Sequence, residues 1–195
     1  MRKRTFIVGA VALLAVGALF ASNMGFKINY QMLGPSNPGS LDGTNVLALP
    51  FNAQTGITDA SLLFDDIGSA VVNNIQSHVE SDNGLWQYPG TNFAIVPGAG
   101  YYVNIGADTN YIIVGSHDPS LTISLEPGTD PNSLDGTSFI AYPYHSTAVD
   151  AQALFLEIGS TIVNNIQAHV ESDNGLWQYP GTNFALVPGE AYFIN

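Results

Sequence analysis

A long internal repeat constrains the fold of this chain more than any other feature. The segment at residues 72–98, VNNIQSHVESDNGLWQYPGTNFAIVPG, returns at residues 163–189 with only two changes in 27 positions, Ser77/Ala168 and Ile95/Leu186. A repeat of this size predicts two similar modules in tandem, each of about 80–95 residues and able to bury a modest core. We call residues 22–117 the first copy and residues 118–195 the second copy.

The local patterns within each copy predict mostly β-structure. Residues 26–33 alternate apolar and polar side chains, as a half-buried strand does, and residues 44–51 form an apolar run that ends near a proline. Asn83-Gly84 predicts a tight hairpin, because both central residues of a type I′ turn need positive φ. Residues 93–96 predict a further short strand. The second copy repeats this order.

One short helix per copy completes the predicted fold. In the first copy the helix spans residues 59–67, with Thr58 or Asp59 as the N-terminal cap and Gly68 as the stop. The predicted fold class is therefore α+β, mainly β, with two small tandem modules. Each is an antiparallel sheet or sandwich carrying one short helix.

The N-terminal residues 1–21 have the layout of a secretory signal peptide. Three basic residues precede an apolar run from Phe6 to Phe20, and small residues follow. Cleavage after Ala21 or after Ala18 fits this layout. The alternative is a retained membrane anchor, although the run is slightly shorter than the ~20 residues that a spanning helix needs. Removal of this segment predicts an extracellular or cell-surface protein with no membrane contact.

The charge is strongly one-sided. The chain has 4 basic and 16 acidic residues, a net charge of −12, and Lys27 is the only basic residue outside residues 1–21. After cleavage the net charge becomes 1 − 16 = −15. Such a surface repels nucleic acid, so we expect no nucleic-acid partner. The chain has no cysteine, which excludes disulfides and thiolate metal sites, and we expect neither a metal nor a cofactor.

Several short motifs resemble a recurrent module of bacterial secreted and cell-surface proteins. These motifs are VLALP at residues 46–50, WQY at 86–88, PGAGYYV at 97–103 and YIIVG at 111–115. The second copy has FIAYP at 139–143, WQY at 177–179 and PGEAYFI at 188–194, with Ala191 in place of a motif glycine. The resemblance covers nearly all of the chain after residue 21. It implies an exported setting and a structural role more than a chemical activity.

No nucleophile elbow, zinc-protease or phosphate-loop motif is present, so we expect a protein that is not an enzyme. The best ligand-binding candidates are two aromatic pairs, Trp86 with Tyr88 and Trp177 with Tyr179. Two residues apart on a strand, the members of each pair face the same side. Exposed pairs would stack on sugar rings and make a carbohydrate-binding or adhesive module, whereas inward-facing pairs would simply fill the core. The core interpretation is favoured, because a small module needs large apolar residues.

A difference between the copies gives the preferred functional hypothesis. The first copy has strands at 100–105 and 111–115, whereas the sequence stops at Asn195 after the counterpart of the first of them, so the second copy is predicted to lack its last strand. An incomplete sheet offers a template for another chain, although a merely shortened or covered edge is the alternative. We expect a secreted structural protein that self-associates into a fibre or layer, with strand exchange between subunits as one route. The predicted self-association residues are Phe26, Ile28, Tyr30, Met32, Tyr192 and Ile194.

Overall fold

The computed structural model describes residues 25–38, 40, 42–49, 56–79, 84–116, 121–128, 136–142, 146–170 and 175–195. Within these residues the chain is mainly β with antiparallel sheets and two short helices, which confirms the mainly β character of the predicted fold class. The first copy forms β1 (Gly25–Met32), β2 (Thr44–Ala48), α2 (Ala60–Ile67), β3 (Val72–Val79), β4 (Gly84–Tyr88), β5 (Gly100–Ile105) and β6 (Thr109–Ser116). The second copy forms β7 (Ser138–Ala141), α3 (Ala151–Ile158), β8 (Ile166–Val170), β9 (Gly175–Tyr179) and β10 (Ala191–Ile194). The predicted signal peptide, the boundary between residues 117 and 118, and Asn83 lie outside the described residues.

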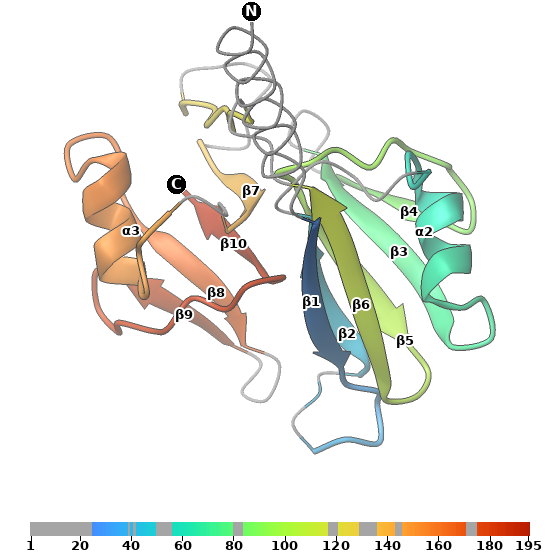
Figure 1. The fold of residues 1–195 in the computed structure, drawn as a ribbon. Helices are drawn as coiled ribbons and strands as arrows, with labels where there is room; N and C mark the ends of the chain where they lie inside the picture. Colours follow the sequence, from blue (N-terminus) through green and yellow to red (C-terminus); the bar gives the residue numbers. More distant parts are fainter. Residues whose placement is uncertain are drawn as a thin grey trace, which may run out of the picture.

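The two copies build four-stranded sheets with corresponding strand orders. The first sheet has the order β2-β5-β3-β4, and the second has the order β7-β10-β8-β9. Figure 1 shows the two sheets meeting in the middle of the molecule, with α2 and α3 on the outer sides. The repeated sequence therefore gives a repeated sheet topology.

Each helix is short and is fixed at both ends by its caps. The Asp59 side chain accepts a hydrogen bond from the Leu62 N–H at 3.1 Å, so Asp59, and not Thr58, is the N-cap of α2. The helix ends at Gly68, which has a φ of 124° and donates its N–H to the Phe64 carbonyl oxygen. At a positive φ, glycine avoids the steric cost that a side chain would carry. The corresponding residues Asp150 and Gly159 cap α3 in the same way.

Residues 93–96 do not form the predicted strand. They make one isolated bridge, between Ala94 and Asp59, beside the start of α2. The Ala60 N–H donates to the Phe93 carbonyl oxygen, and the Ile95 N–H donates to the Thr58 carbonyl oxygen. The alternation was nevertheless informative, because Phe93 and Ile95 are buried while Ala94 is exposed. The segment therefore forms its backbone hydrogen bonds with the residues at the start of α2 and not with a sheet.

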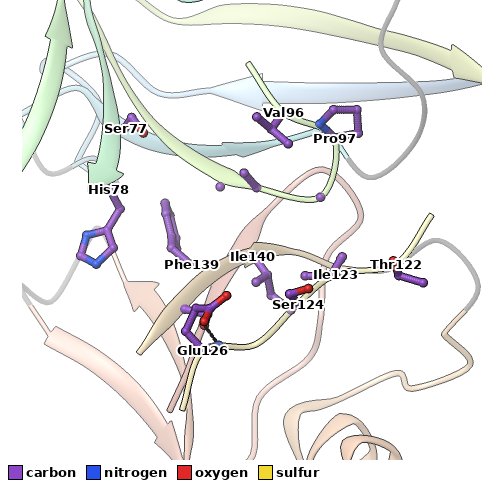
Figure 2. Close-up of a pocket in the computed structure, with 14 residues that line it drawn as sticks. Ser77, His78, Val96, Pro97, Thr122, Ile123, Ser124, Glu126, Phe139 and Ile140 are labelled. Carbon is purple, nitrogen blue, oxygen red and sulfur yellow. Dashed lines mark hydrogen bonds between the residues drawn. The ribbon is translucent and has the colours of Figure 1, made fainter. Parts of the chain in front are cut away.

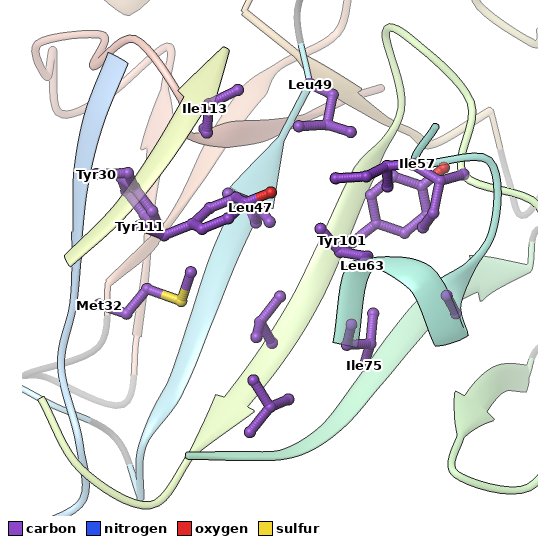
Figure 3. Close-up of a cluster of buried hydrophobic side chains, with 14 of the residues drawn as sticks. Tyr30, Met32, Leu47, Leu49, Ile57, Leu63, Ile75, Tyr101, Tyr111 and Ile113 are labelled. Atoms are coloured by element: carbon purple, nitrogen blue, oxygen red, sulfur yellow. The ribbon is translucent and has the colours of Figure 1, made fainter. Parts of the chain in front are cut away.

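The core of the first copy lies between its four-stranded sheet and a two-stranded ribbon. This ribbon is β1 paired antiparallel with β6 over eight positions, from Gly25↔Ser116 to Met32↔Thr109. It places Tyr30, Met32 and Ile113 over Leu47 of the sheet, and α2 covers the rest of that face (Figure 3). Burial of each such large apolar side chain contributes roughly 1.5–3 kcal/mol, so β1 is part of the fold of the first copy.

The opposite faces of the two sheets pack against each other. Strand alternation puts Leu47 and Tyr101 toward the first core, and it puts Val46 and Tyr102 on the other side. The residues buried at this junction come from β2, β7 and β10: Val46, Ala48, Phe139, Ala141, Ala191 and Phe193. Equivalent backbone hydrogen bonds run from the first copy to the second and from the second copy to the first. The Ala48 N–H donates to the Gly189 carbonyl oxygen at 2.9 Å, and the Ala141 N–H donates to the Gly98 carbonyl oxygen at 2.8 Å.

Two buried tyrosines fix the Pro-Gly turns that make these junction contacts. The Tyr101 hydroxyl accepts a hydrogen bond from the Val96 N–H at 2.6 Å, and the Tyr192 hydroxyl accepts one from the Val187 N–H at 2.7 Å. Burial raises the pKa of both hydroxyls above the ordinary tyrosine value. Both therefore stay protonated around neutral pH and hold the turns in place.

Candidate functional site

The first copy closes one end of its core with a tight corner at residues 105–108, which leads from β5 into β6. The Ile105 N–H donates to the Gly43 carbonyl oxygen at 2.9 Å, and the Gly106 N–H donates to the Val71 carbonyl oxygen at 2.8 Å. A Cβ added to Gly34 would lie only 2.7 Å from the Ala107 backbone. The corner is therefore packed tightly against the segments around it.

Asp108 anchors the same corner. Its carboxylate accepts hydrogen bonds from the Gly34 N–H at 2.7 Å and from the Asn37 side-chain amide at 3.1 Å. The bond from Gly34, and then the bond from Asn37, lowers the pKa of Asp108 below its ordinary value. The carboxylate is ionised at neutral pH and ties the start of β6 to the loop after β1.

In the second copy, the equivalent corner is an open pocket of ≈ 370 Å³. The shared sequence SLDGT, at residues 40–44 and 133–137, and the long repeat align its lining with the walls of the first corner. The aligned pairs are Met32 with Leu125, Gly34 with Pro127, Gly43 with Gly136, Val71 with Ile162, and Asn104 with Asn195. The walls that hold residues 105–108 in the first copy thus surround a hollow in the second.

Ile162 is more exposed to solvent than the corresponding residue of the first copy. This side chain lines the pocket and is 72% exposed, whereas its counterpart Val71 is half-buried beside Gly106. Ile162 therefore adds apolar surface at the rim of the pocket. The exposed side chain of Ile162 and the pocket thus lie side by side.

Residues 121–125 extend this open region away from the pocket. Their exposure alternates: Leu121, Ile123 and Leu125 are half-buried, whereas Thr122 and Ser124 are exposed. Ile123 and Leu125 pack against the core of the second copy, as Tyr30 and Met32 of β1 pack against the first. Within the described residues, 121–125 is paired with no strand, whereas β1 is paired with β6 along its whole length. The segment is an extended edge without its ribbon partner.

A second hollow, of ≈ 280 Å³, lies at the junction of the copies. Figure 2 shows Ser77, His78 and the turn at Val96 and Pro97 facing Phe139 and residues 122–126 across it. The His78 ring lies 6.3 Å from the Phe139 ring and 6.0 Å from the Phe193 ring. Among the residues that the structure describes, no group of three or more potential metal-ligating side chains gathers here or elsewhere.

The predicted aromatic pairs divide between core and surface. Tyr88 packs edge-on against Phe64 of α2 at 5.4 Å, and Tyr179 packs in the same way against Phe155 of α3. Trp86 and Trp177 lie farther along the same strands, and each is 46% exposed. Neither pair forms an open two-ring platform, and in each pair the tryptophan is the accessible ring.

The predicted self-association residues lie inside the chain's own sheets. Ile28 packs against the first core, where Tyr30 and Met32 are buried, while the side chain of Phe26 lies outside the description. Tyr192 and Ile194 are buried in β10, which has β7 on one side and β8 on the other. Among the described residues, the segment without a strand partner is therefore 121–125, whereas β10 is paired on both of its sides.

The repeated order of elements predicts a strand at residues 121–128, which the structure does not form, and sequence reasoning did not identify 121–125 or the pocket at Ile162 as a candidate site. The signal was present in the alternation of Leu121, Ile123 and Leu125, which matches that of residues 28–32 once SLDGT is used to align the copies. Such an alignment identifies 121–125 as the counterpart of β1. It cannot show that β1 pairs with β6, because pairing between distant strands is not visible in one sequence.

Comparison with known proteins gives no match to a protein-family model, to a curated protein or to a solved structure. Across the part of the chain that the structure describes, no helix has the length and apolar character needed to cross a membrane. The geometry of the second copy is therefore the basis for a functional proposal.

Proposed function

We propose that this is an exported, non-enzymatic structural protein of the bacterial cell surface that self-associates through the open sheet edge of its second copy. The observation that carries the proposal is the extended segment 121–125, which has no strand partner among the described residues. Backbone N–H and C=O groups at such an edge are a template for a strand of another molecule. The neighbouring pocket and the exposed Ile162 add apolar surface to this edge.

The composition supports strand addition over an ionic contact. Outside residues 1–21 the chain has one lysine and 16 acidic residues. Ion pairs between two molecules of this protein therefore cannot dominate an interface. Backbone hydrogen bonds and apolar contacts are the remaining means of association. Like-charge repulsion opposes the contact, and dissolved salt screens this repulsion.

Residues 22–195 are expected to form oligomers whose size grows with protein concentration. The oligomers should grow further when salt rises from about 20 mM to about 300 mM, because the Debye length then shortens from about 20 Å to about 6 Å. Sedimentation velocity and electron microscopy of the same samples measure this. A chain that stays monomeric at every concentration and salt level would refute self-association.

A disulfide lock tests whether β1 is the strand that is exchanged. Asn29 and Ile112 are direct partners on the exposed face of the β1–β6 ribbon, and the chain has no other cysteine to interfere. Asn29→Cys with Ile112→Cys, once oxidised, holds β1 in its own molecule. We expect oligomers to persist in the oxidised form and in its reduced control. Loss of oligomers on oxidation alone would show that β1 is donated to the neighbour.

A carbohydrate-binding role is the second candidate, and the exposure of Trp86 and Trp177 favours it. If these rings stack on sugars, soluble oligosaccharides should shift or quench the tryptophan emission. Trp86→Ala and Trp177→Ala should each weaken binding to a multivalent glycan surface, because two sites add avidity. Tyr88→Phe is the matched control, since its ring packs against Phe64. Emission that no oligosaccharide in a broad panel perturbs would exclude this role.

A further inference from the structure

We propose that the two faces of the junction are a matched pair through which two molecules of this protein join, the first copy of one molecule packing against the second copy of the other. The junction face of a copy is the side of its sheet that the other copy covers. This inference rests on the proposed self-association and assigns a further interface to it. Its basis is the junction within one molecule, where this contact is already formed.

The two junction faces use aligned positions but carry side chains of different size. The aligned pairs are Val46 with Phe139, Ala48 with Ala141, Gly100 with Ala191, and Tyr102 with Phe193. The Phe139 ring stacks on Tyr102 at 5.0 Å and on Phe193 at 4.4 Å. The face of the second copy therefore carries the larger side chain at the two positions where the first copy has Val46 and Gly100.

The backbone contacts across the junction do not distinguish the copies. The Ala141 N–H donates to the Gly98 carbonyl oxygen, and the Ala48 N–H donates to the Gly189 carbonyl oxygen. These two bonds join aligned positions in opposite directions. Two first copies, or two second copies, placed in this arrangement would form the same pair of bonds. The side chains alone therefore determine which copies fit together.

Only a first copy packed against a second copy fills the junction without crowding. Two first copies would place Val46 where the Phe139 ring lies, and the resulting void weakens a buried contact. Two second copies would place Ala191 against Ala191, although even a Cβ on Gly100 would lie only 2.5 Å from the Ala191 Cβ. Overpacking of this kind is also unfavourable. The face of the first copy thus selects the face of a second copy.

A second molecule of this protein carries the face that is required. Two molecules that exchange copies re-form between chains the contacts that one chain makes within itself, so exchange is a low-cost route to association. Only residues 117–120 lie between the end of β6 at Ser116 and Leu121 of the second copy, and a short connection favours exchange. The closed and exchanged forms bury the same junction. Exchange should therefore increase with protein concentration and after brief opening of the junction in mild denaturant.

Single cysteines can report which copies meet, because the chain has no cysteine of its own. Ala99 and Ile140 are antiparallel partners across the junction, and Glu190 and Leu47 occupy the aligned positions on its other side. Four chains of residues 22–195 each carry one substitution: Ala99→Cys, Ile140→Cys, Leu47→Cys or Glu190→Cys. They are mixed in pairs, exposed briefly to mild denaturant, returned to buffer and oxidised. Non-reducing gel electrophoresis measures the disulfide-linked dimers.

Two of the mixtures test a first copy against a second copy and should give cross-linked dimers. These are Ala99→Cys with Ile140→Cys, and Glu190→Cys with Leu47→Cys. Ala99→Cys with Leu47→Cys tests two first copies, and Glu190→Cys with Ile140→Cys tests two second copies. The yields of the last two mixtures should be lower by about tenfold or more, because a void or an overpacked contact weakens association by at least this factor.

Equal yields from all four mixtures would overturn the matched pairing, and the absence of dimers from both mixed-copy pairs at every concentration would overturn the exchange. Circular dichroism checks that each reduced variant is folded. The two mixed-copy pairs place their buried cysteine in different copies, at Ile140 and at Leu47. One pair therefore still tests the contact if the other substitution unfolds its own copy.

These results separate the inference from assembly through residues 121–125. Oligomers of the unsubstituted chain, without cross-linked dimers in either mixed-copy pair, would retain the proposed function and refute the inference. Cross-linked dimers from a chain that forms no species larger than a dimer would retain the inference and refute assembly through the open edge.

Discussion

Phe139→Ala is expected to lower the free energy of unfolding by about 3–5 kcal/mol, the usual range for loss of a buried phenylalanine. Phe139 stacks on Phe193 with ring centroids 4.4 Å apart, and it stacks on Tyr102 at 5.0 Å. Its contacts thus come from both copies. Chemical denaturation followed by circular dichroism measures the loss.

The same substitution should also divide the unfolding transition. With the Phe139 ring removed, the junction loses its stacking on Phe193 and Tyr102, and the two copies should begin to unfold separately. Leu156→Ala is the matched control, because this side chain is 62% exposed on α3 and should change stability by no more than about 0.5 kcal/mol. A loss below about 1 kcal/mol for Phe139→Ala, with a single transition, would show that the sheets do not pack this way in solution.

The junction explains features that a single copy does not. Gly98 and Gly189 each accept a backbone hydrogen bond from the other copy, and each lies beneath a side chain of the covering segments. A Cβ on Gly98 would lie 2.9 Å from Ile123, and one on Gly189 would lie 3.4 Å from Ile28. The β1–β6 ribbon and residues 121–125 therefore each bridge from their own core to the other copy. A strand added at 121–125 would lie close to this junction.

The sequence predicted the local elements well, because their signals are local. The alternation of residues 26–33 gave β1, and the glycine after a capped apolar stretch gave the end of α2. Residues 93–96 failed as a strand, because Thr58 and Ala60 at the start of α2 took their hydrogen bonds. Alternation reports which side chains are buried, and it does not report which backbone partner is available.

The candidate site was predicted only in outline. The sequence comparison directed attention to β10, whereas the segment without a strand partner among the described residues is 121–125. The reason is physical: β10 is an inner strand, whereas β6 belongs to a ribbon that joins distant parts of the chain. Tyr88 packs against Phe64 of α2, in line with the core interpretation of the aromatic pairs, whereas Trp86 is 46% exposed.

Gly100 and Ala191 are corresponding residues that differ between the copies, and the junction gives the reason. A Cβ on Gly100 would lie 2.5 Å from the Ala191 Cβ and 2.8 Å from the Phe139 ring. The space at this point holds one methyl group, and Ala191 supplies it. The alanine that departs from the resembled motif thus fits a position where the facing residue is glycine.

Gly100→Ala is therefore expected to lower the free energy of unfolding by about 1–3 kcal/mol through overpacking. Ala191→Gly alone should cost about 0.5–1 kcal/mol, because a glycine within a strand loses more entropy on folding. The double variant moves the methyl group from one copy to the other and should lose less than the sum of the two single losses. Denaturation of all four proteins gives the coupling free energy, expected at about 0.5–3 kcal/mol for residues in direct contact. Strictly additive losses would mean that the two positions do not meet, and that Gly100 is retained for a reason within its own sheet.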